Sequence, residues 1–398
     1  MKTYGIILAG GGGTRFWPLS RQDLPKQFLN LTGADMLVNE TIDRLSQFVP
    51  KENIFVVTSA AQTPLMIEAT SSRIPEDHIL SEPAARNTSA CIGYAAMEIL
   101  RKYGDGVMCI LPSDHYIKEP ENYTQVMKKA IQTAMDTRQL VTVGIKPTFA
   151  SSGYGYIQFR NSNTSASNIS KSAGKGAKAT GKALAAGKTE TKSATNLYDN
   201  CANTVTEPVY YEVTDFVEKP DIRTAKAYVK SGQFLWNSGM FIWQASVILE
   251  YFKKLLPDIY EKLEEIGNAM GTASEREVID RVYPDIPKIS IDYGIMERAD
   301  RVLVLMGEFG WNDVGSWDAL QALYEPDENG NIIYGEQVHI GTRNCIAYAK
   351  SKLIAALGVE DLIIVEADDA IMVCHKDKAQ DVKKIVEELK AEGKQKYL

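Results

Sequence analysis

The feature that most constrains this chain is an apolar run near its start that breaks abruptly into glycine. Residues 4–9 (YGIILA) have the pattern of a short buried strand, and Gly10–Gly13 follow directly. Four glycines let backbone N–H groups turn toward an anion without obstruction by a Cβ atom. Tight turns also use glycine, so this pattern alone leaves a phosphate-binding loop and a structural turn both open.

The alternation of strand and helix patterns continues to residue 145. Strands are predicted at 54–58, 107–111 and 140–145, and helices at 36–49, 60–72, 87–103 (capped by Asn87) and 123–135. This alternation predicts an α/β sheet with helices on both faces. Because such sheets bind ligands outside the carboxyl ends of their strands, we expect the site in the loops after Ala9 and Leu111.

Residues 161–205 interrupt this pattern. They are rich in Ser, Ala, Gly, Lys and Thr, and 161–196 contain no aromatic residue. Such a composition buries too little apolar surface to offset the entropy of ordering. We predict a disordered insertion in a hairpin-like connection between the strand patterns at 153–159 and 210–220. Six lysines leave an anion-binding or docking arm as the alternative.

A second region follows the turn-rich residues 325–330. Short apolar runs predict strands at 345–349, 353–357, 362–365 and 370–373, closed by an amphipathic helix at 377–392. We therefore expect two domains, 1–325 and 326–398, the second a small β domain. Its periodicity alone does not establish a β-helix.

Composition excludes several classes of protein. The net charge of −7 over 398 residues argues against nucleic acid as a partner, although a nucleotide needs only a local cationic pocket. Five scattered cysteines without a C-x-x-C pair predict a reducing compartment and no structural zinc. We find no signal-peptide pattern and no apolar run near 20 residues, so we expect a cytoplasmic protein without a membrane partner.

Seven motifs, in order, resemble those of the sugar-1-phosphate nucleotidyltransferases. They are GGGGTRFWPLSRQDLPKQFL (10–29), EPAARNT (82–88), LPSDH (111–115), FVEKP (216–220), WNSGMF (236–241), SIDYGIMERAD (290–300) and WNDVGSW (311–317). The first two are similar to the mannose-1-phosphate guanylyltransferase branch. The resemblance covers about 1–325 apart from the insertion. It implies a Rossmann-like, GT-A-like mixed sheet flanked by helices. For the C-terminal β domain, a short left-handed β-helix is one of the folds we consider.

The resemblance also implies roles for individual residues. The nucleotide-binding set is Leu8, Ala9, Gly10, Gly11, Gly12, Gly13, Thr14, Arg15, Lys26, Glu82, Pro83, Arg86, Asn87 and Thr88. The sugar-phosphate set is Gly155, Tyr156, Glu218, Lys219, Asn237 and Asp292. The metal set, for Mg²⁺, is Asp114 and Asp313, and the catalytic set is Arg15, Lys26 and Lys219. Without the resemblance, an Asp after a strand is more often a turn or cap residue, and a Glu-Lys pair is usually a solvated surface.

The implied reaction is GTP plus α-D-mannose 1-phosphate giving GDP-mannose and pyrophosphate. A phosphate monoester is already largely charged at pH 7, so the nucleophile needs no general base. Mg²⁺ is usually held by one or two carboxylates plus substrate phosphates, which suits two aspartates. We assign His115 a loop-positioning role and expect a homodimer.

Two alternatives stay open at this stage. One is a related transferase with another base or hexose 1-phosphate, because one hydroxyl contact can change specificity greatly. The other is a non-catalytic nucleotide-sugar sensor, although the charged residues of the motifs are all present. After Asp313 the only histidines are His339 and His375, so we expect no cupin-type isomerase site.

Overall fold

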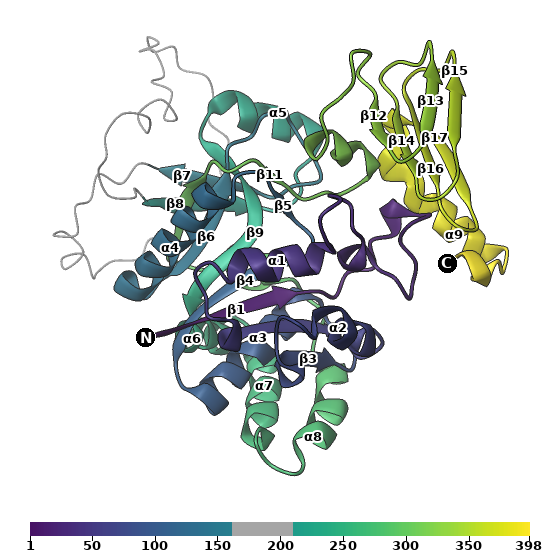
Figure 1. The fold of residues 1–398 in the computed structure, drawn as a ribbon. Coiled ribbons are helices and arrows are strands. Elements are labelled where there is room, and N and C mark those ends of the chain that lie inside the picture. The colour runs from purple at the N-terminus through teal and green to yellow at the C-terminus, as the bar shows by residue number, and fades with distance from the viewer. Residues whose placement is uncertain (161–209) are drawn as a thin grey trace, which may run out of the picture.

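The computed structural model of the chain describes residues 1–160 and 210–398, and its centre is one mixed sheet (Figure 1). The nine strands lie in the order β3 (Ile79–Glu82), β2 (Ile54–Ser59), β1 (Lys2–Leu8), β4 (Gly106–Pro112), β9 (Phe234–Gln244), β6 (Leu140–Ile145), β10 (Val302–Gly307), β8 (Tyr210–Val217) and β7 (Tyr156–Arg160). The strands from β3 to β4 are parallel, whereas β9 runs antiparallel to β4, β6 and β7. The α/β prediction is confirmed.

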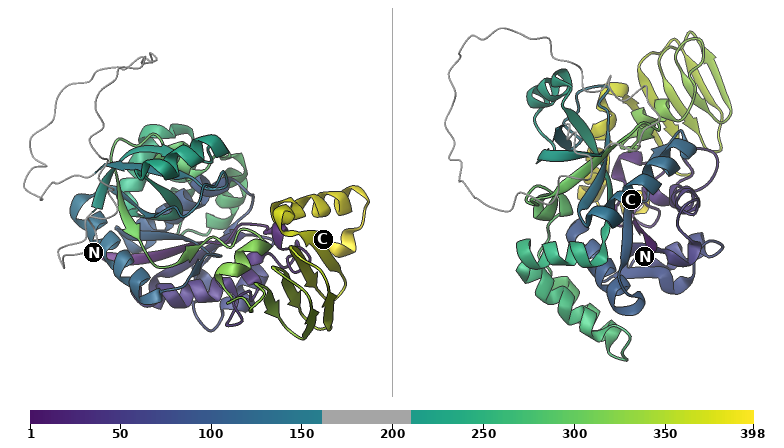
Figure 2. Two further views of the ribbon diagram at one scale, coloured as in Figure 1. Left: turned by 90° about the horizontal axis from the view of Figure 1, so that it is seen from above. Right: turned by 90° about the vertical axis from the view of Figure 1, so that its left-hand side faces the viewer.

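Helices cover both faces of this sheet (Figures 1 and 2). One face packs on α3 (Asn87–Glu98), α6 (Ala245–Leu255), α7 (Pro257–Ala269) and α8 (Glu275–Val282), and the other on α1 (Leu37–Leu45), α2 (Thr63–Thr70), α4 (Pro120–Thr137) and α5 (Ile222–Ser231). Strand β1 shows why. Ile6 packs into the first apolar layer and Ile7 into the second, because successive side chains of a strand point to opposite faces.

All four helix predictions differ from the structure at their ends, and the one over 87–103 continues beyond Glu98 as a π-helical turn. The helix predicted over 36–49 ends at Leu45, and turns lead to Pro50, since the residue before a proline disfavours helical backbone. Asn87 has a left-handed backbone (φ 65°), and its side-chain oxygen accepts a hydrogen bond from the adjacent Thr88 N–H, so it does not cap α3 in the predicted way. Within 1–160 and 210–398, no helix combines the length and apolar character that crossing a membrane requires.

Strands β7 and β8 stand on either side of the predicted insertion. They pair antiparallel, with Tyr156 opposite Val217, as expected for a hairpin-like connection. The predicted insertion at 161–205 lies outside the described residues.

The C-terminal region forms a β-helix-like stack of short strands, seen at the upper right of Figure 1. On one side β12 (Ile332–Tyr334), β14 (Ile346–Ala349) and β16 (Leu362–Glu366) are parallel, and on the other β13 (Gln337–Ile340) pairs parallel with β15 (Ile354–Leu357). Strand β17 (Ile371–His375) adds antiparallel to β16. Parallel pairing between successive coils is the mark of a solenoid, which sequence periodicity alone did not establish.

The closing helix differs from its prediction. Instead of one helix over 377–392, a 3₁₀ segment (Lys376–Val382) precedes α9 (Lys383–Ala391). Ala379 and Val382 of the 3₁₀ segment are buried against the neighbouring domain. This packing fixes the position of the 3₁₀ segment. The GT-A-like and left-handed assignments stay predictions.

Candidate active site

The glycine loop leaves the carboxyl end of β1 and remains largely exposed. A Cβ atom on Gly11 or Gly12 would meet no atom within 4 Å, so their backbone faces open space. Gly13 is different: its φ is 56°, and a Cβ there would lie 2.3 Å from the Cβ of Lys26. Glycine is therefore required at this position for the loop to close over Lys26. Arg15, just beyond, is exposed.

Lys26 connects two loops that are remote in sequence. Its buried ammonium donates to Asp114 Oδ2 at 2.8 Å and to the Asp313 carbonyl at 2.7 Å. The two loops meet because β5 (Tyr116–Ile117) pairs antiparallel with β11 (Trp311–Asn312). Burial acts to raise the pKa of the Asp114 carboxyl, but the Lys26 charge holds that pKa below its ordinary value.

His115 supports this junction. Its Nδ1 accepts a hydrogen bond from Trp311 Nε1 at 3.1 Å, and burial lowers the pKa of the imidazole to about 4. The ring is therefore neutral at pH 7 and fixed in orientation. This arrangement fits the loop-positioning role assigned to His115.

The two aspartates suit a divalent cation that also binds substrate phosphates. Lys26 holds the Asp114 carboxylate and the Asp313 main-chain carbonyl at one junction, so the two aspartates are near one another. Among the residues described, no group of three or more His, Cys, Asp or Glu forms a metal site, so substrate phosphates would have to supply further ligands. A pair of carboxylates with phosphate oxygens is the usual environment of Mg²⁺. The donor set therefore fits the predicted metal.

One pocket, of about 210 Å³, opens beside this junction. Its lining includes the predicted residues Leu8, Thr88, Gly155, Glu218, Asn237, Asp292 and Asp313. We call it the sugar-side pocket because four of the six residues predicted for the sugar phosphate line it; Leu8 and Thr88, predicted for the nucleotide, line it as well. Residues from β1, α3, β9 and the 290–300 segment thus meet at one place, as the sequence motifs predict.

Hydrogen bonds order the acidic wall of the sugar-side pocket. Asn237 Nδ2 donates to Asp292 Oδ1 at 2.9 Å, and Lys219 Nζ donates to Glu218 Oε1 at 2.6 Å. Burial, with the nearby Glu218 charge, raises the pKa of Asp292 to about 6. For Lys219, burial acts to lower the pKa, but the bond to Glu218 raises it above its ordinary value. Lys219 reaches the pocket through Glu218 and does not line it itself.

Tyr156 does not form a wall of this pocket, contrary to prediction. Its ring is fully buried, and its hydroxyl donates to the Ser151 carbonyl at 3.1 Å. The alternation of β7 directs this side chain into the core. Gly155 does line the pocket, and a Cβ there would lie 2.3 Å from Glu218 Oε2, so a larger residue would displace the Glu218 carboxylate.

The EPAARNT segment is tied to residues 283–291. Glu82 accepts a hydrogen bond from the Tyr283 hydroxyl, Arg86 donates to the Pro284 carbonyl, and Thr88 Oγ1 accepts from Ile291 N–H at 2.8 Å. Burial raises the pKa of Glu82 to about 7, although the Tyr283 hydrogen bond acts to lower it. A Cβ on Gly10 would lie 3.6 Å from Glu82 Oε2, so this carboxyl borders the glycine loop. Pro83 is half-buried and Asn87 exposed at the same edge.

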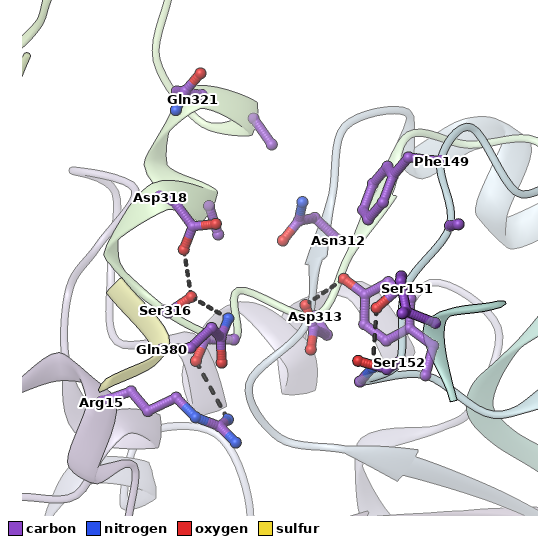
Figure 3. Close-up of a pocket in the computed structure, with 17 residues that line it drawn as sticks. Arg15, Phe149, Ser151, Ser152, Asn312, Asp313, Ser316, Asp318, Gln321 and Gln380 are labelled. Atoms are coloured by element: carbon purple, nitrogen blue, oxygen red, sulfur yellow. Dashed lines mark hydrogen bonds between the residues drawn. The ribbon is translucent and has the colours of Figure 1, made fainter. Parts of the chain in front are cut away.

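A second cavity, of about 810 Å³, lies on the other side of Asp313 (Figure 3). We call it the large pocket. Arg15, Asp313 and Gln380 are among its lining residues, the last from the C-terminal region. Val314 beside it has φ 46°, a conformation that costs a β-branched residue about 1–3 kcal/mol and tends to mark functional sites.

The structure adds three residues to the predicted site. Tyr154 donates from its hydroxyl to Asp313 Oδ1 at 2.9 Å, Trp311 holds His115, and Gln380 reaches Ser316. Trp311 lies inside the 311–317 motif and Tyr154 is next to the predicted residue Gly155, so both could have been found from the sequence. Nothing in the sequence around Gln380 marks it.

Comparison with known proteins agrees with this geometry. The family model "Nucleotidyl transferase" matches residues 4–187 and 203–329, and the model "MannoseP isomerase/GMP-like beta-helix domain" matches 335–389. The Mannose-1-phosphate guanylyltransferase of Escherichia coli K12 is 32% identical over 100% of this chain and 75% of the relative. The Xanthan biosynthesis protein XanB of Xanthomonas campestris B100 is 34% identical over 98% of this chain and 73% of its own length.

A solved structure extends the similarity to three dimensions. It comes from Thermus thermophilus and is described as a mannose-1-phosphate geranyltransferase. It is 30% identical, has a TM-score of 0.79, and covers 98% of this chain and 100% of its own. The similarity therefore includes the sheet and the β-helix-like region together.

Proposed function

The chain belongs to the nucleotidyl transferase family, and from this premise we propose that it transfers GMP from GTP to α-D-mannose 1-phosphate, releasing pyrophosphate. One observation carries the proposal: Lys26 binds the Asp114 carboxylate and the Asp313 carbonyl, and Asp313 lines both pockets. A sugar phosphate in one pocket and a triphosphate beside Arg15 would meet at this junction.

The residues here favour direct attack by the sugar phosphate on the α-phosphorus of the nucleotide. That phosphate is largely ionised at pH 7, so no side chain has to remove a proton from it. Nδ1 of His115, the adjacent imidazole, already accepts a hydrogen bond from Trp311, so this acceptor is not available as a base. Catalysis then rests on position and charge, with Arg15 and Lys26 offsetting the charge of the leaving pyrophosphate.

Nucleotidyl transferases of this family use a divalent metal, and we assign Mg²⁺ to it. Asp114 and Asp313 would hold the ion together with substrate phosphates. When bound, such an ion withdraws electron density from a phosphoryl group and neutralises developing charge. The Asp313 carboxylate is already oriented by the Tyr154 hydroxyl.

We assign the two sides of the cleft to different substrates. Glu218, Asn237 and Asp292 supply acceptors and donors suited to hexose hydroxyls. Lys219, which pairs with Glu218 outside the lining of the pocket, would have to leave Glu218 to meet the sugar phosphate. The glycine loop, Arg15 and the EPAARNT segment would bind the nucleotide. The tie between Glu82 and Tyr283 supports this, because it keeps an acidic group beside Gly10.

We also propose that 1–325 is the catalytic domain and 326–398 a β-helix domain. In support, the nine-stranded sheet is complete by Gly307, and the matched family models change between 329 and 335. A cytoplasmic location is supported by the four cysteines within the described ranges, all of which are free thiols.

For the expected homodimer, the exposed side chains of Ile340 and Leu357, on two paired strands, offer an apolar face. Light scattering of wild type against Leu357→Glu tests this.

The decisive experiment pairs each of four nucleoside triphosphates with mannose 1-phosphate and glucose 1-phosphate. Release of pyrophosphate is measured with and without Mg²⁺. We expect turnover with GTP and mannose 1-phosphate only when Mg²⁺ is present. Faster turnover with another pair would instead assign the chain to a related transferase, and no turnover with any pair would support the sensor alternative.

A further inference from the structure

The C-terminal region packs directly on both loops that border the large pocket. One apolar cluster joins Phe16 and Trp17 after the glycine loop, Val314 and Trp317 after Asp313, and Tyr348 and Val382 of the C-terminal region. We call it the interdomain cluster. Trp17 Nε1 also donates to the Tyr397 carbonyl at 2.8 Å, and Arg21 pairs with Asp369 at 2.7 Å. The C-terminal region therefore packs against these two loops and fixes their positions.

The loop that carries Asp313 depends on such support. Val314 holds a left-handed backbone (φ 46°) with its side chain fully buried in the interdomain cluster. The Asn312 side chain accepts from Val314 N–H at 2.7 Å. A Cβ on Gly315 would lie 2.8 Å from Asp313 Oδ2, so the carboxylate lies directly over that glycine. A backbone conformation of this kind persists only where its surroundings fix it.

One polar side chain of the C-terminal region reaches into the large pocket itself. Gln380, on the 3₁₀ segment, donates from Nε2 to Ser316 Oγ at 2.6 Å, and Ser316 Oγ in turn donates to Asp318 (Figure 3). Arg15 approaches the same loop, with a long 3.5 Å contact to the Gly315 carbonyl. Of the residues after 335 that the structure describes, Gln380 is the one that lines this pocket.

We propose that Gln380 is a positioning residue for the pyrophosphate side of the active site. Through Ser316 it holds the part of the loop that follows Asp313, and so sets where the Gly315 carbonyl meets Arg15. The β-helix domain is then part of the catalytic apparatus and not a separable appendage. This inference rests on the proposed function, in which Arg15 meets the leaving pyrophosphate, because Arg15 lines the large pocket.

The geometry restricts the effect to one substrate. The Gln380–Ser316 bond lies on the far side of Asp313 from the sugar-side pocket, whose lining contains neither residue. Loss of the bond should therefore weaken use of pyrophosphate and leave GDP-mannose binding unchanged. A purely structural role would instead lower stability or affect both substrates equally.

The test measures the reverse reaction, in which GDP-mannose and pyrophosphate yield GTP and mannose 1-phosphate. In Gln380→Ala we expect the KM for pyrophosphate to rise by about tenfold, since a small misplacement of catalytic groups is costly. The KM for GDP-mannose and the melting temperature should match wild type. Lys378→Ala, an exposed change on the same segment, is the matched control.

A double-mutant cycle tests the route through Ser316. Because Gln380 acts on the loop through Ser316 Oγ, Ser316→Ala should show the same pyrophosphate defect, and the double variant should be no worse than either. An unchanged KM for pyrophosphate in Gln380→Ala, an equal rise in both KM values, or additive effects in the double variant would overturn the inference. An inactive wild type would instead refute the proposed function.

Discussion

The two pockets on either side of Asp313 are built differently. The sugar-side pocket is lined by residues of the sheet domain, and its Asn237–Asp292 bond is internal to that domain. The large pocket lies between the sheet domain and the C-terminal region, and its loop contains Val314 with a left-handed backbone. Under the proposed function, selection of the sugar can rest on the sheet domain alone, whereas the pyrophosphate side also involves Gln380 of the C-terminal region.

The largest effect should follow a change at the junction that both pockets share. Asp114→Asn removes a proposed metal ligand and the partner of Lys26, and we expect kcat to fall by about 10³-fold. Initial rates across a Mg²⁺ series measure this. The exposed Asp136→Asn on α4 serves as the control. Near-normal activity of Asp114→Asn with an unchanged Mg²⁺ dependence would remove the metal role.

A smaller effect, confined to the large pocket, should follow loss of Arg15. Arg15→Ala should lower kcat by about 10²-fold, because a cation near the leaving pyrophosphate is lost. Arg15 is exposed, so thermal unfolding should be unchanged, and Arg15→Lys should recover part of the rate. If Arg15→Ala changed the KM for mannose 1-phosphate more than kcat, Arg15 would act on the sugar-side pocket and the two pockets would not differ as described.

On the sugar side, Asn237→Ala should raise the KM for mannose 1-phosphate by about tenfold, the effect of losing one hydrogen bond to a polar ligand. The bond to Asp292 is lost as well. In the reverse reaction the KM for pyrophosphate should not change. Equal rises in both KM values would show that the two pockets are not independent.

The last effect concerns the pH dependence of stability and not the kinetics of either pocket. The folded-state pKa of Glu82 is raised to about 7 from an ordinary value of 4.5. The folded protein therefore binds more protons than the unfolded chain between these values, and stability falls as pH rises from 4.5 to 7. Glu82→Gln removes this loss, which is about 3 kcal/mol.

Thermal unfolding at pH 5 and pH 8 measures this prediction. Wild type should lose more stability than Glu82→Gln between the two values, because the glutamine does not titrate while its carbonyl still accepts from Tyr283. A matching control is Glu40→Gln on α1. Parallel losses in wild type and Glu82→Gln would show that Glu82 titrates at its ordinary pKa.

Much of the fold was predictable, because local patterns of apolar and turn residues indicate where strands and helices lie. The strands at 54–58 and 140–145 appear within one residue of their predicted bounds, because short apolar runs between turn residues usually form buried strands. The position of β9 was not predictable. It passes antiparallel between β4 and β6, and only non-local pairing decides such an order.

The site residues likewise fall into those that the motifs predicted and those that only the structure revealed. Motifs predicted that Asp114, Asn237 and Asp292 lie at one cleft, and the structure places Asn237 and Asp292 in one hydrogen bond. They did not reveal that the side chain of Tyr156 turns into the core, or that Gln380 joins the large pocket. Neighbours in sequence do not determine which residues of a second domain reach a site.

The sequence by itself determined the chemistry available to this protein: a glycine loop after a strand, two cations, two aspartates, and a β domain at the end. Only the tertiary structure decided which of these groups meet. Lys26 and Asp313 are 287 residues apart in the chain, yet they share a hydrogen bond. The physical reason is that backbone preferences act over a few residues, whereas burial of the interdomain cluster fixes how distant loops pack.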